Sequence, residues 1–312
     1  MAEHGLSAEP THSRWDRKLA SRIRIAPGDT VQMECVDSSG SQVQPEMTVE
    51  EFLQIDRGRI HALTGPIYVE GAEPGDVLQI DVLEVAHRGW GWSSVINGLG
   101  FLKERFAQPY LFHWKLESML SRSLEPALVP LHPFCGVMGV ARAEEGEFRT
   151  RPPGSFGGNM DVRELCSGAT LYLPVFNRGG LFSAGDAHAA QGDGEVCING
   201  IECPADAKLR FSLHKQKPLA GPLIESGARE RKAGSEEAWI VVESGDHAVT
   251  AARAATSRMI DLLMDRWGFR EVHAYLLCSV AMNLRLSQVV NEPMFTVSAA
   301  INKSVLPPRR LF

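Results

Sequence analysis

The 312-residue sequence contains no run of about 18 consecutive apolar residues, the length that a membrane-spanning helix requires. Its first residues, MAEHGLSAEPTHSRWDRK, are polar and lack the apolar core of a secretory signal peptide. The net charge is -6, and no basic run is interleaved with aromatic residues. We therefore expect a cytoplasmic protein that binds neither a membrane nor a nucleic acid.

Short motifs of several large enzyme classes are also missing. The chain has no G-x-x-x-x-G-K-[ST] phosphate loop, no G-x-G-x-x-G after a strand, no G-x-S-x-G elbow and no H-E-x-x-H helix. Its six cysteines form no C-x-x-C pair, so we expect buried free thiols rather than a disulfide scaffold. Any catalytic site must therefore be built from other residues.

The composition is that of an ordinary globular protein, 44% hydrophobic and 22% charged. Two Pro-Gly-Asp turns open strand-like runs, and further short strands are expected between them and the C-terminal third. The predicted strands are 27–36, 64–69, 74–85, 128–140, 170–175, 196–203 and 205–217.

The C-terminal third has helical spacing instead. One helix is expected from an N-cap at Asp246 to a stop at Gly268, and a second covers 271–290. The predicted class is α+β and β-dominated, with short strands in a barrel or sandwich and flanking C-terminal helices.

The chain is expected to divide into a leader, residues 1–20, and a catalytic unit, residues 21–312, which could comprise two interleaved β-rich subdomains. Three segments are expected to be irregular. The leader reads as poorly ordered or loosely docked. The Gly- and aromatic-rich segment 87–110 suits a loop over a pocket. Residues 152–161 also read as a loop.

The densest group of ionisable residues is GDAHAAQGDGE at 185–195. Asp186 and His188 are two apart, so on an extended segment both face one side and could bind a divalent metal. Glu195 lies beyond a Gly-Asp-Gly turn and could fold back as a general base. The alternative is a plain turn in which Asp186 and Asp193 bind their own backbone. The residue types leave both open.

Weaker candidates lie elsewhere. His61 precedes a Thr-Gly-Pro turn, where a lone histidine is more often a satisfied polar group than a ligand. Asn159 and Asp161 follow a Gly-Gly pair and could serve a site or stabilise a turn.

Several segments of the chain resemble the acetamidase/formamidase family. They are PGDTV (27–31), TGPIYVEGAEPGDVL (64–78), GGNMD (157–161), LYLPV (171–175), GDAHAAQGDGEV (185–196) and LRLSQVVN (284–291). The resemblance runs in order over roughly residues 22–306.

This resemblance implies a metal-assisted hydrolase of small amides such as formamide and acetamide, or in some members cyclic lactams. It implies zinc, with calcium as an alternative, and a homodimer or larger homo-oligomer. Metal ligands map onto Asp186 and His188, with His61 and Asp161 as weaker matches. Glu195 maps as the catalytic base, together with Asp186 and His188.

Two departures from the family lie near the expected pocket. Phe156 stands where many members have histidine, and Asn199 lies where many read Cys-Gly-Thr-Ala. We expect Phe156, Asn199 and Asn159 at the substrate. The expected reaction is hydrolysis of a small linear amide to a carboxylate and ammonia. The alternatives are a lactam hydrolase and a metal-binding paralogue without catalysis.

Overall fold

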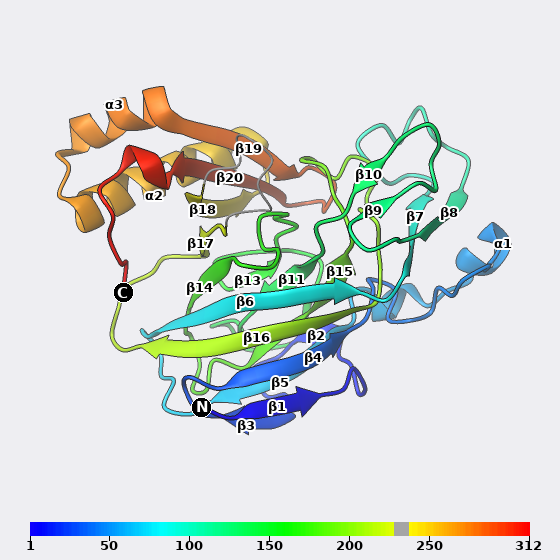
Figure 1. The fold of residues 1–312 in the computed structure, drawn as a ribbon, viewed down its shortest axis with the longest axis horizontal. Helices are drawn as coiled ribbons and strands as arrows, with labels where there is room; N and C mark the ends of the chain where they lie inside the picture. Colours follow the sequence, from blue (N-terminus) through cyan, green and yellow to red (C-terminus); the bar gives the residue numbers. More distant parts are fainter. Residues whose placement is uncertain (228–236) are drawn as a thin grey trace.

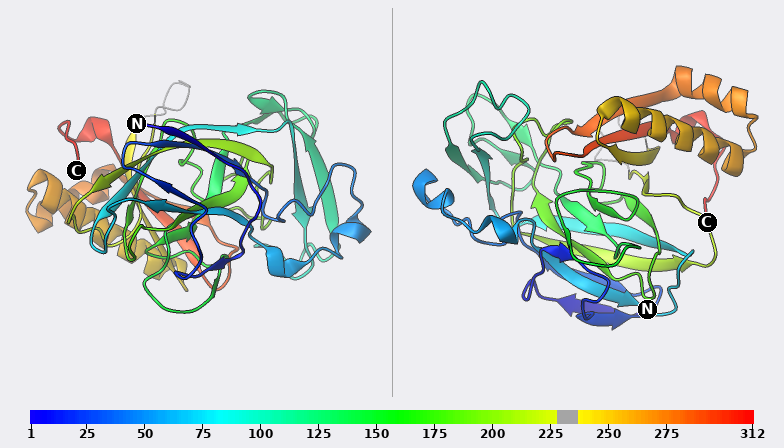
Figure 2. Two further views of the ribbon diagram at one scale, coloured as in Figure 1. Left: turned by 90° about the horizontal axis from the view of Figure 1, so that it is seen from below. Right: turned by 180° about the vertical axis from the view of Figure 1, so that it is seen from behind.

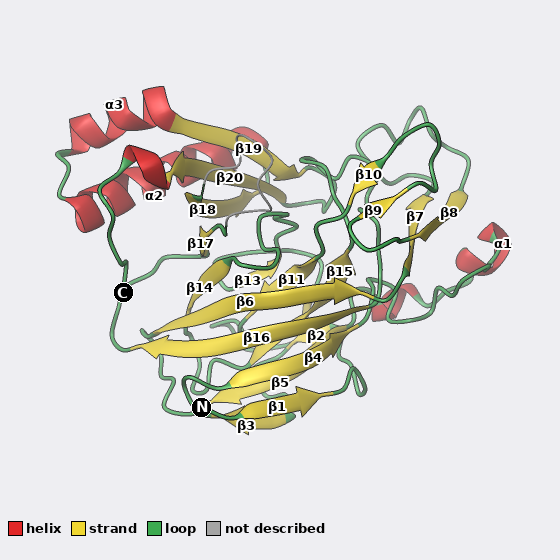
Figure 3. Cartoon of the chain, viewed as in Figure 1, coloured by secondary structure: helices red, strands yellow, loops and turns green. Residues whose placement is uncertain are grey.

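The computed structural model describes residues 1–227 and 237–312, and most of its regular structure is β-strand (Figures 1 and 3). A nine-stranded mixed sheet runs through the whole molecule. Its strands, in spatial order, are β1 (Glu3–Leu6), β4 (Thr30–Cys35), β16 (Ala205–His214), β6 (Val77–His87), β14 (Thr170–Pro174), β17 (Leu223–Glu225), β18 (Ala238–Gly245), β20 (Phe295–Asn302) and β19 (Met282–Gln288).

A second, five-stranded sheet carries the Gly-Gly pair at 157–158 and the start of the GDAHAAQGDGE stretch. Its order is β13 (Gly157–Asn159), β11 (Phe134–Gly139), β15 (Phe182–His188), β5 (Leu63–Val69) and β3 (Ile23–Ile25). Three short ribbons complete the β structure: β2 (Arg14–Trp15) with β12 (Phe148–Arg149), β7 (Trp90–Val95) with β8 (Tyr110–Lys115), and β9 (Leu120–Ser121) with β10 (Val129–Pro130).

The two sheets share one apolar core. In β4, buried side chains alternate with partly exposed ones, and Met33 belongs to the same buried cluster as Ile80 of β6. The smaller sheet contributes Ile67 of β5 and Val137 of β11 to that cluster. Removal of these faces from water is the main stabilising term for such a sandwich. The predicted β-dominated α+β class is confirmed.

The helices gather at the C-terminal end. α2 (Ala248–Trp267) lies on β18 and β20, and α3 (Glu271–Ala281) packs beside it, while α1 (Val49–Phe52) stands apart (Figures 1 and 2). Met259 and Leu263 of α2 enter a second apolar core with the sheet. The helix ends at Gly268, whose φ of 71° matches the predicted stop.

Two details of the helical prediction are wrong. His247, not Asp246, is the N-cap residue of α2, and no side chain caps the helix there. The second helix stops at Ala281, because residues 282–288 extend and pair with β20 as β19. Pairing with a long neighbouring strand outweighs the local helical spacing.

Strand predictions at 27–36, 64–69, 74–85, 128–140, 170–175 and 205–217 are confirmed, whereas the one at 196–203 is wrong. That segment forms turns, and Val196 is 58% exposed although its apolar side chain suggested a strand. The supposed loop 87–110 instead contains β7 and the start of the β7–β8 hairpin. Residues 152–161 include the short strand β13.

Residues 1–20 are packed against the fold rather than loosely docked. β1 pairs in parallel with β4, and the side chain of Trp15 is 2% exposed. The carboxylate of Asp29 accepts the main-chain N–H of Ala2 and contacts His4, at 2.6 and 2.9 Å. The division of the remaining chain into subdomains stays a prediction.

Candidate metal centre and substrate cavity

Asp186 and His188 meet at a break in the smaller sheet. β11 and β15 pair at Cys135–Ala187 and at Val137–Gly185, but not between Gly136 and Asp186. The N–H of Asp186 donates instead to the carbonyl of Val36, and its φ is 55°. As a result, Asp186 Oδ1 lies 3.5 Å from His188 Nε2. The predicted pairing of these side chains is therefore present.

Gly136 makes room for a second aspartate at this break. Its carbonyl accepts the N–H of Asp161, which follows β13 and has a φ of 50°. A Cβ atom at position 136 would lie 2.6 Å from Asp161 Oδ1 and 3.1 Å from Asp186 Oδ2. Only glycine lets both carboxylates occupy this space.

The loop after β15 brings two glutamates to the same place. Glu195 lies after the turn that begins at Gly192, and its loop is tied to β19 through hydrogen bonds between Gly194 and residues 287 and 289. Glu202 Oε1 lies 2.9 Å from His188 Nε2. Potential ligand atoms of His188, Glu195 and Glu202 all lie within 4.8 Å of one another, as do those of Asp161, Asp186 and His188.

Gln191 orients the imidazole of His188. Its amide nitrogen donates to the carbonyls of Asp161 and Ser287, at 2.8 and 3.2 Å, so its amide oxygen faces His188 Nδ1 at 2.9 Å. Nδ1 therefore carries a proton, because the amide oxygen can only accept. Burial lowers the pKa of His188, but Glu202 and Asp186 outweigh it and raise that pKa well above its usual value. Nε2 faces the carboxylates, the position of the metal-binding nitrogen in a histidine that has lost its second proton.

Buried ligand atoms at this place lack hydrogen-bond partners within the described chain. They are Asp161 Oδ1, Asp186 Oδ1, His188 Nε2 and Glu195 Oε2. Nε2 lies close to two carboxylates but without the angles of a hydrogen bond, which is the arrangement expected when all these atoms face one point. Carboxylates and one imidazole fit a divalent cation.

The electrostatics agree with this fit. Burial, together with the charge of Asp186, raises the pKa of Asp161 to about 8 and that of Glu202 to about 7. Burial and the neighbouring Asp161 raise the pKa of Glu195 as well. Burial also opposes ionisation of Asp186, but His61 and His188 lower its pKa to about 2. The cluster thus contains four buried acids, and a bound cation would favour their ionised forms.

The weaker candidates fall at different distances from this cluster. His61 Nε2 lies 4.0 Å from Asp186 Oδ2, and the His61 Nδ1 atom has no partner in the described chain. Asn159 is buried in β13, with both amide atoms equally without partners. Asn291, which sequence reasoning missed, donates from Nδ2 to Asp161 Oδ2 at 2.5 Å.

A cavity of about 390 Å³ reaches the cluster. His61, Asn291 and Asn199 line it together with Trp92, and Leu99 comes from the segment predicted to cover a pocket. The aromatic-rich segment therefore does line a pocket, through strand β7 and the connection from β7 to β8.

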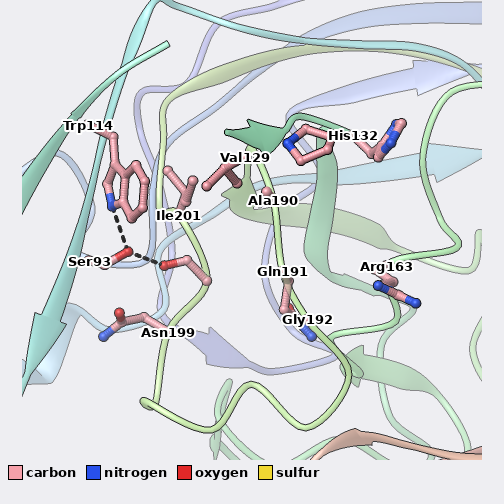
Figure 4. Close-up of a pocket in the computed structure, with 12 residues that line it drawn as sticks. Ser93, Trp114, Val129, His132, Arg163, Ala190, Gln191, Gly192, Asn199 and Ile201 are labelled. Carbon is pink, nitrogen blue, oxygen red and sulfur yellow. Dashed lines mark hydrogen bonds between the residues drawn. The ribbon is translucent and has the colours of Figure 1, made fainter. Parts of the chain in front are cut away.

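A second cavity of about 500 Å³ is lined by residues that include Ala190, Gln191 and Ile201 (Figure 4). It is larger, and none of the four acids is among the described residues that line either cavity. There, Trp114 Nε1 donates to Ser93 Oγ, which donates to the carbonyl of Gly200. Only the cavity of about 390 Å³ is connected to the acids through His61 and Asn291, among the residues that the structure describes.

The two departures from the family pattern have different surroundings. Asn199 lines both cavities, but its amide is bound to Ser94 through three hydrogen bonds, at 2.9, 2.9 and 3.2 Å. Phe156 is 4% exposed and packs edge-on against Trp15, with ring centroids 5.3 Å apart. It is absent from the described walls of both cavities, because Trp15 and Arg142 cover its ring.

Comparison with known proteins identifies the family. The model of the acetamidase/formamidase family matches residues 3–147 and 141–307. The chain belongs to this family. The resemblance of its motifs is thereby confirmed, and the family consists of amide hydrolases.

Relatives of this family agree in sequence and structure. A formamidase of Methylophilus methylotrophus is 28% identical, over 65% of this chain and 64% of that protein, so the chain spans about two thirds of its length. An acetamidase of Mycolicibacterium smegmatis is 27% identical, over 86% and 85%. The crystal structure of an acetamidase from Bacillus halodurans superposes with a TM-score of 0.89 at 31% identity, over 96% of this chain and 98% of that one.

Sequence reasoning missed four residues of the site: Gly136, Gln191, Glu202 and Asn291. Glu202 carried the clearest signal, since a lone acid in the apolar run Ile201-Glu202-Cys203 must find a partner if it is buried. Gln191 lies inside the GDAHAAQGDGE stretch. In the described part of the chain, no helix combines the length and apolarity needed to cross a bilayer.

Proposed function

We propose that this protein hydrolyses a carboxylic amide to a carboxylate and ammonia or an amine, with the help of a divalent metal ion. One observation carries the proposal. Buried ligand atoms of Asp161, Asp186, His188 and Glu195 lack partners in the described chain, and each of the three acids offers an atom within 4.8 Å of His188. This cluster adjoins a cavity of about 390 Å³ through His61 and Asn291. Membership of a family of amide hydrolases supports it.

Asp186 and His188 are the proposed primary ligands, with Asp161 and Glu202 beside them. His61 lies a little farther away, at 4.0 Å from Asp186, and lines the cavity as a contact to metal or substrate. A bound divalent ion would polarise the amide carbonyl and make water more acidic. We favour zinc because one or two imidazoles join the carboxylates, and calcium is the alternative because most ligand atoms are oxygen.

Glu195 is the proposed general base. Its Oε2 atom is buried and unpartnered, and the pKa of its carboxyl is raised, so it can both take and return a proton. It removes a proton from the attacking water and delivers it to the departing nitrogen. The amide C–N bond breaks, a C–O bond forms, and the nitrogen leaves as ammonia or an amine. The unpartnered amide of Asn159 is a proposed substrate contact.

The cavity volume favours a second candidate substrate, a bulkier or cyclic amide. A volume of about 390 Å³ lies within the range of roughly 300–1,000 Å³ found for drug-sized ligands. Formamide would leave most of it empty. We also propose a cytoplasmic location and a homodimer or larger homo-oligomer.

The substitution Glu195→Gln tests the assignment. It keeps the shape of the side chain but removes the proton acceptor, so kcat should fall by about 10²–10⁴-fold while the metal content stays the same. The matched control is Asp193→Asn in the same loop, because Asp193 is partly exposed and pairs with Arg163 at 2.9 Å.

Amide hydrolysis by each variant is followed as ammonia release for linear amides and by chromatography for lactams. Turnover close to that of the wild type in Glu195→Gln would refute the base assignment. If the wild-type protein binds metal but hydrolyses none of the linear amides and lactams tested, it is a paralogue without catalysis.

A further inference from the structure

The wall of the substrate cavity is strongly basic. Arg14, Arg57, Arg149 and Arg151 all line it. No acidic side chain belongs to this wall among the residues that the structure describes. A neutral amide such as acetamide has no use for four guanidinium groups around its binding site.

These arginines are not neutralised elsewhere. In the described chain, no carboxylate lies within ion-pair distance of Arg149 or Arg151. Glu292, the acid with the largest influence on Arg151, is itself paired with Lys103 at 3.0 Å. The guanidinium of Arg57 stacks on Phe52, 5.0 Å from the ring centroid. Burial lowers the pKa of Arg57 and Arg151, which shows that both groups are partly desolvated.

Two of the four arginines face each other across a strand pair, which lowers the stability of the fold. Arg14 and Arg149 are direct partners in the antiparallel β2–β12 ribbon. Like charges at such positions are destabilising, because the Cβ atoms lie only about 5 Å apart. The side chain of Arg14 is held by the carbonyls of Ser13 and Gly58, at 2.7 and 3.3 Å, rather than by an acid. A bound anion would relieve this repulsion.

The rest of the wall is mainly apolar. Its apolar side chains are Phe52, Ile55, Ile60, Trp92, Ile96, Leu99 and Ile198. The cavity wall thus combines three kinds of side chain: polar groups that contact the acid cluster, apolar side chains and arginines. A ligand that satisfies all three has an amide, a hydrocarbon body and a negative charge.

We propose that the preferred substrate is an amide that carries a carboxylate elsewhere on the same molecule, and that Arg149 and Arg151 bind this carboxylate. This inference rests on the proposed amide hydrolysis and adds the substrate class to it. Guanidinium groups suit the role because their donors match the two oxygens of a carboxylate.

The test compares two amides of equal chain length, pentanamide and the monoamide of glutaric acid. We expect kcat/KM to be at least about tenfold higher for the acid-bearing amide at low ionic strength, since charge-assisted hydrogen bonds are the stronger ones. Added salt should reduce this preference, because screening weakens exposed pairs. Calorimetry measures the binding of both amides independently of turnover.

Three variants accompany the wild type. Arg149→Gln and the double variant with Arg151→Gln should lose the preference for the acid-bearing amide, so that kcat/KM for the two amides becomes equal. Arg253→Gln, on the exposed face of α2, is the matched control and should change nothing. If the double variant fails to fold, the single variant at the exposed Arg149 still decides the matter.

The two hypotheses fail in different ways. Equal kcat/KM for both amides would overturn the carboxylate proposal and leave amide hydrolysis intact. Arginine-dependent binding of the acid-bearing amide without any turnover would support the carboxylate site and overturn amide hydrolysis. A preference that survives in the arginine variants would mean that the carboxylate binds elsewhere, which also overturns the proposal.

Discussion

At the scale of single residues, the site depends on backbone conformations that side chains with a Cβ rarely adopt. The φ angles of Asp161, Asp186 and Glu195 are 50°, 55° and 48°. Such conformations cost on the order of 1–3 kcal/mol each and persist where the surroundings impose them. Here they point three carboxylates at one histidine, an arrangement that a regular strand would not provide.

Gly136 offers the sharpest test at this scale. In Gly136→Ala the new methyl group would meet both Asp161 and Asp186, so the ligands must separate. The backbone of Gly136 is not in the left-handed region, so alanine brings no φ strain of its own. We expect the affinity for the divalent ion to fall by about 10–100-fold, the size of effect seen when the surroundings of metal ligands are disturbed.

Gly192→Ala is the control for this substitution. It adds the same methyl group in the loop that carries Glu195, where no atom lies within 4 Å of it. Metal titration by calorimetry compares both variants with the wild type. An unchanged affinity in Gly136→Ala would show that these two aspartates do not share an ion.

At the scale of elements, the β7–β8 hairpin and the loop 189–204 form one wall of the substrate cavity. Asn199 of the loop joins them, because its amide satisfies the buried main-chain and side-chain groups of Ser94. We expect this residue to influence substrate binding through the hairpin. Its direct contact with substrate stays a prediction, which its place in the cavity wall allows.

The substitution Asn199→Ala should weaken this connection. It leaves the N–H of Ser94 without a partner, so we expect a loss of about 1–3 kcal/mol in the free energy of unfolding. Because the hairpin would no longer be held against the loop, KM for the amide substrate should also rise, with the metal content unchanged. Urea unfolding and steady-state kinetics measure the two effects.

Asn177→Ala provides the comparison. The amide of Asn177 donates to two main-chain carbonyls, those of Ala141 and Arg142. Asn177 is not among the described residues that line the cavity. We expect it to lose stability and keep its KM. A KM that stays constant in Asn199→Ala as well would separate the hairpin from substrate binding.

At the scale of the whole molecule, local patterns predicted much of the fold. Pro-Gly-Asp turns followed by alternating side chains located β4 and β6, and helical spacing with a terminal glycine located α2. The pattern failed where pairing between distant segments decides the conformation. β19 reads as a helix but pairs with β20, and 196–203 reads as a strand but turns to deliver Glu195 and Glu202.

The site could be predicted only in part for the same reason. Asp186, His188 and Glu195 are close in sequence, so one stretch revealed them. Gly136 and Asn291 lie far along the chain, and only the folded sheets bring them to the cluster. Phe156 shows the reverse situation: a departure from the family motif suggests a substrate contact, and the structure places the ring in the core against Trp15.

The central claim is that the buried cluster holds a divalent cation, and the metal content of the purified protein tests it most directly. Elemental analysis after dialysis against zinc should find about one ion per chain in the wild type, as in other sites with three or four protein ligands. The paired substitution Asp186→Asn with His188→Ala should abolish this binding. A folded wild-type protein that retains no zinc, calcium or other divalent ion after such dialysis would contradict the account.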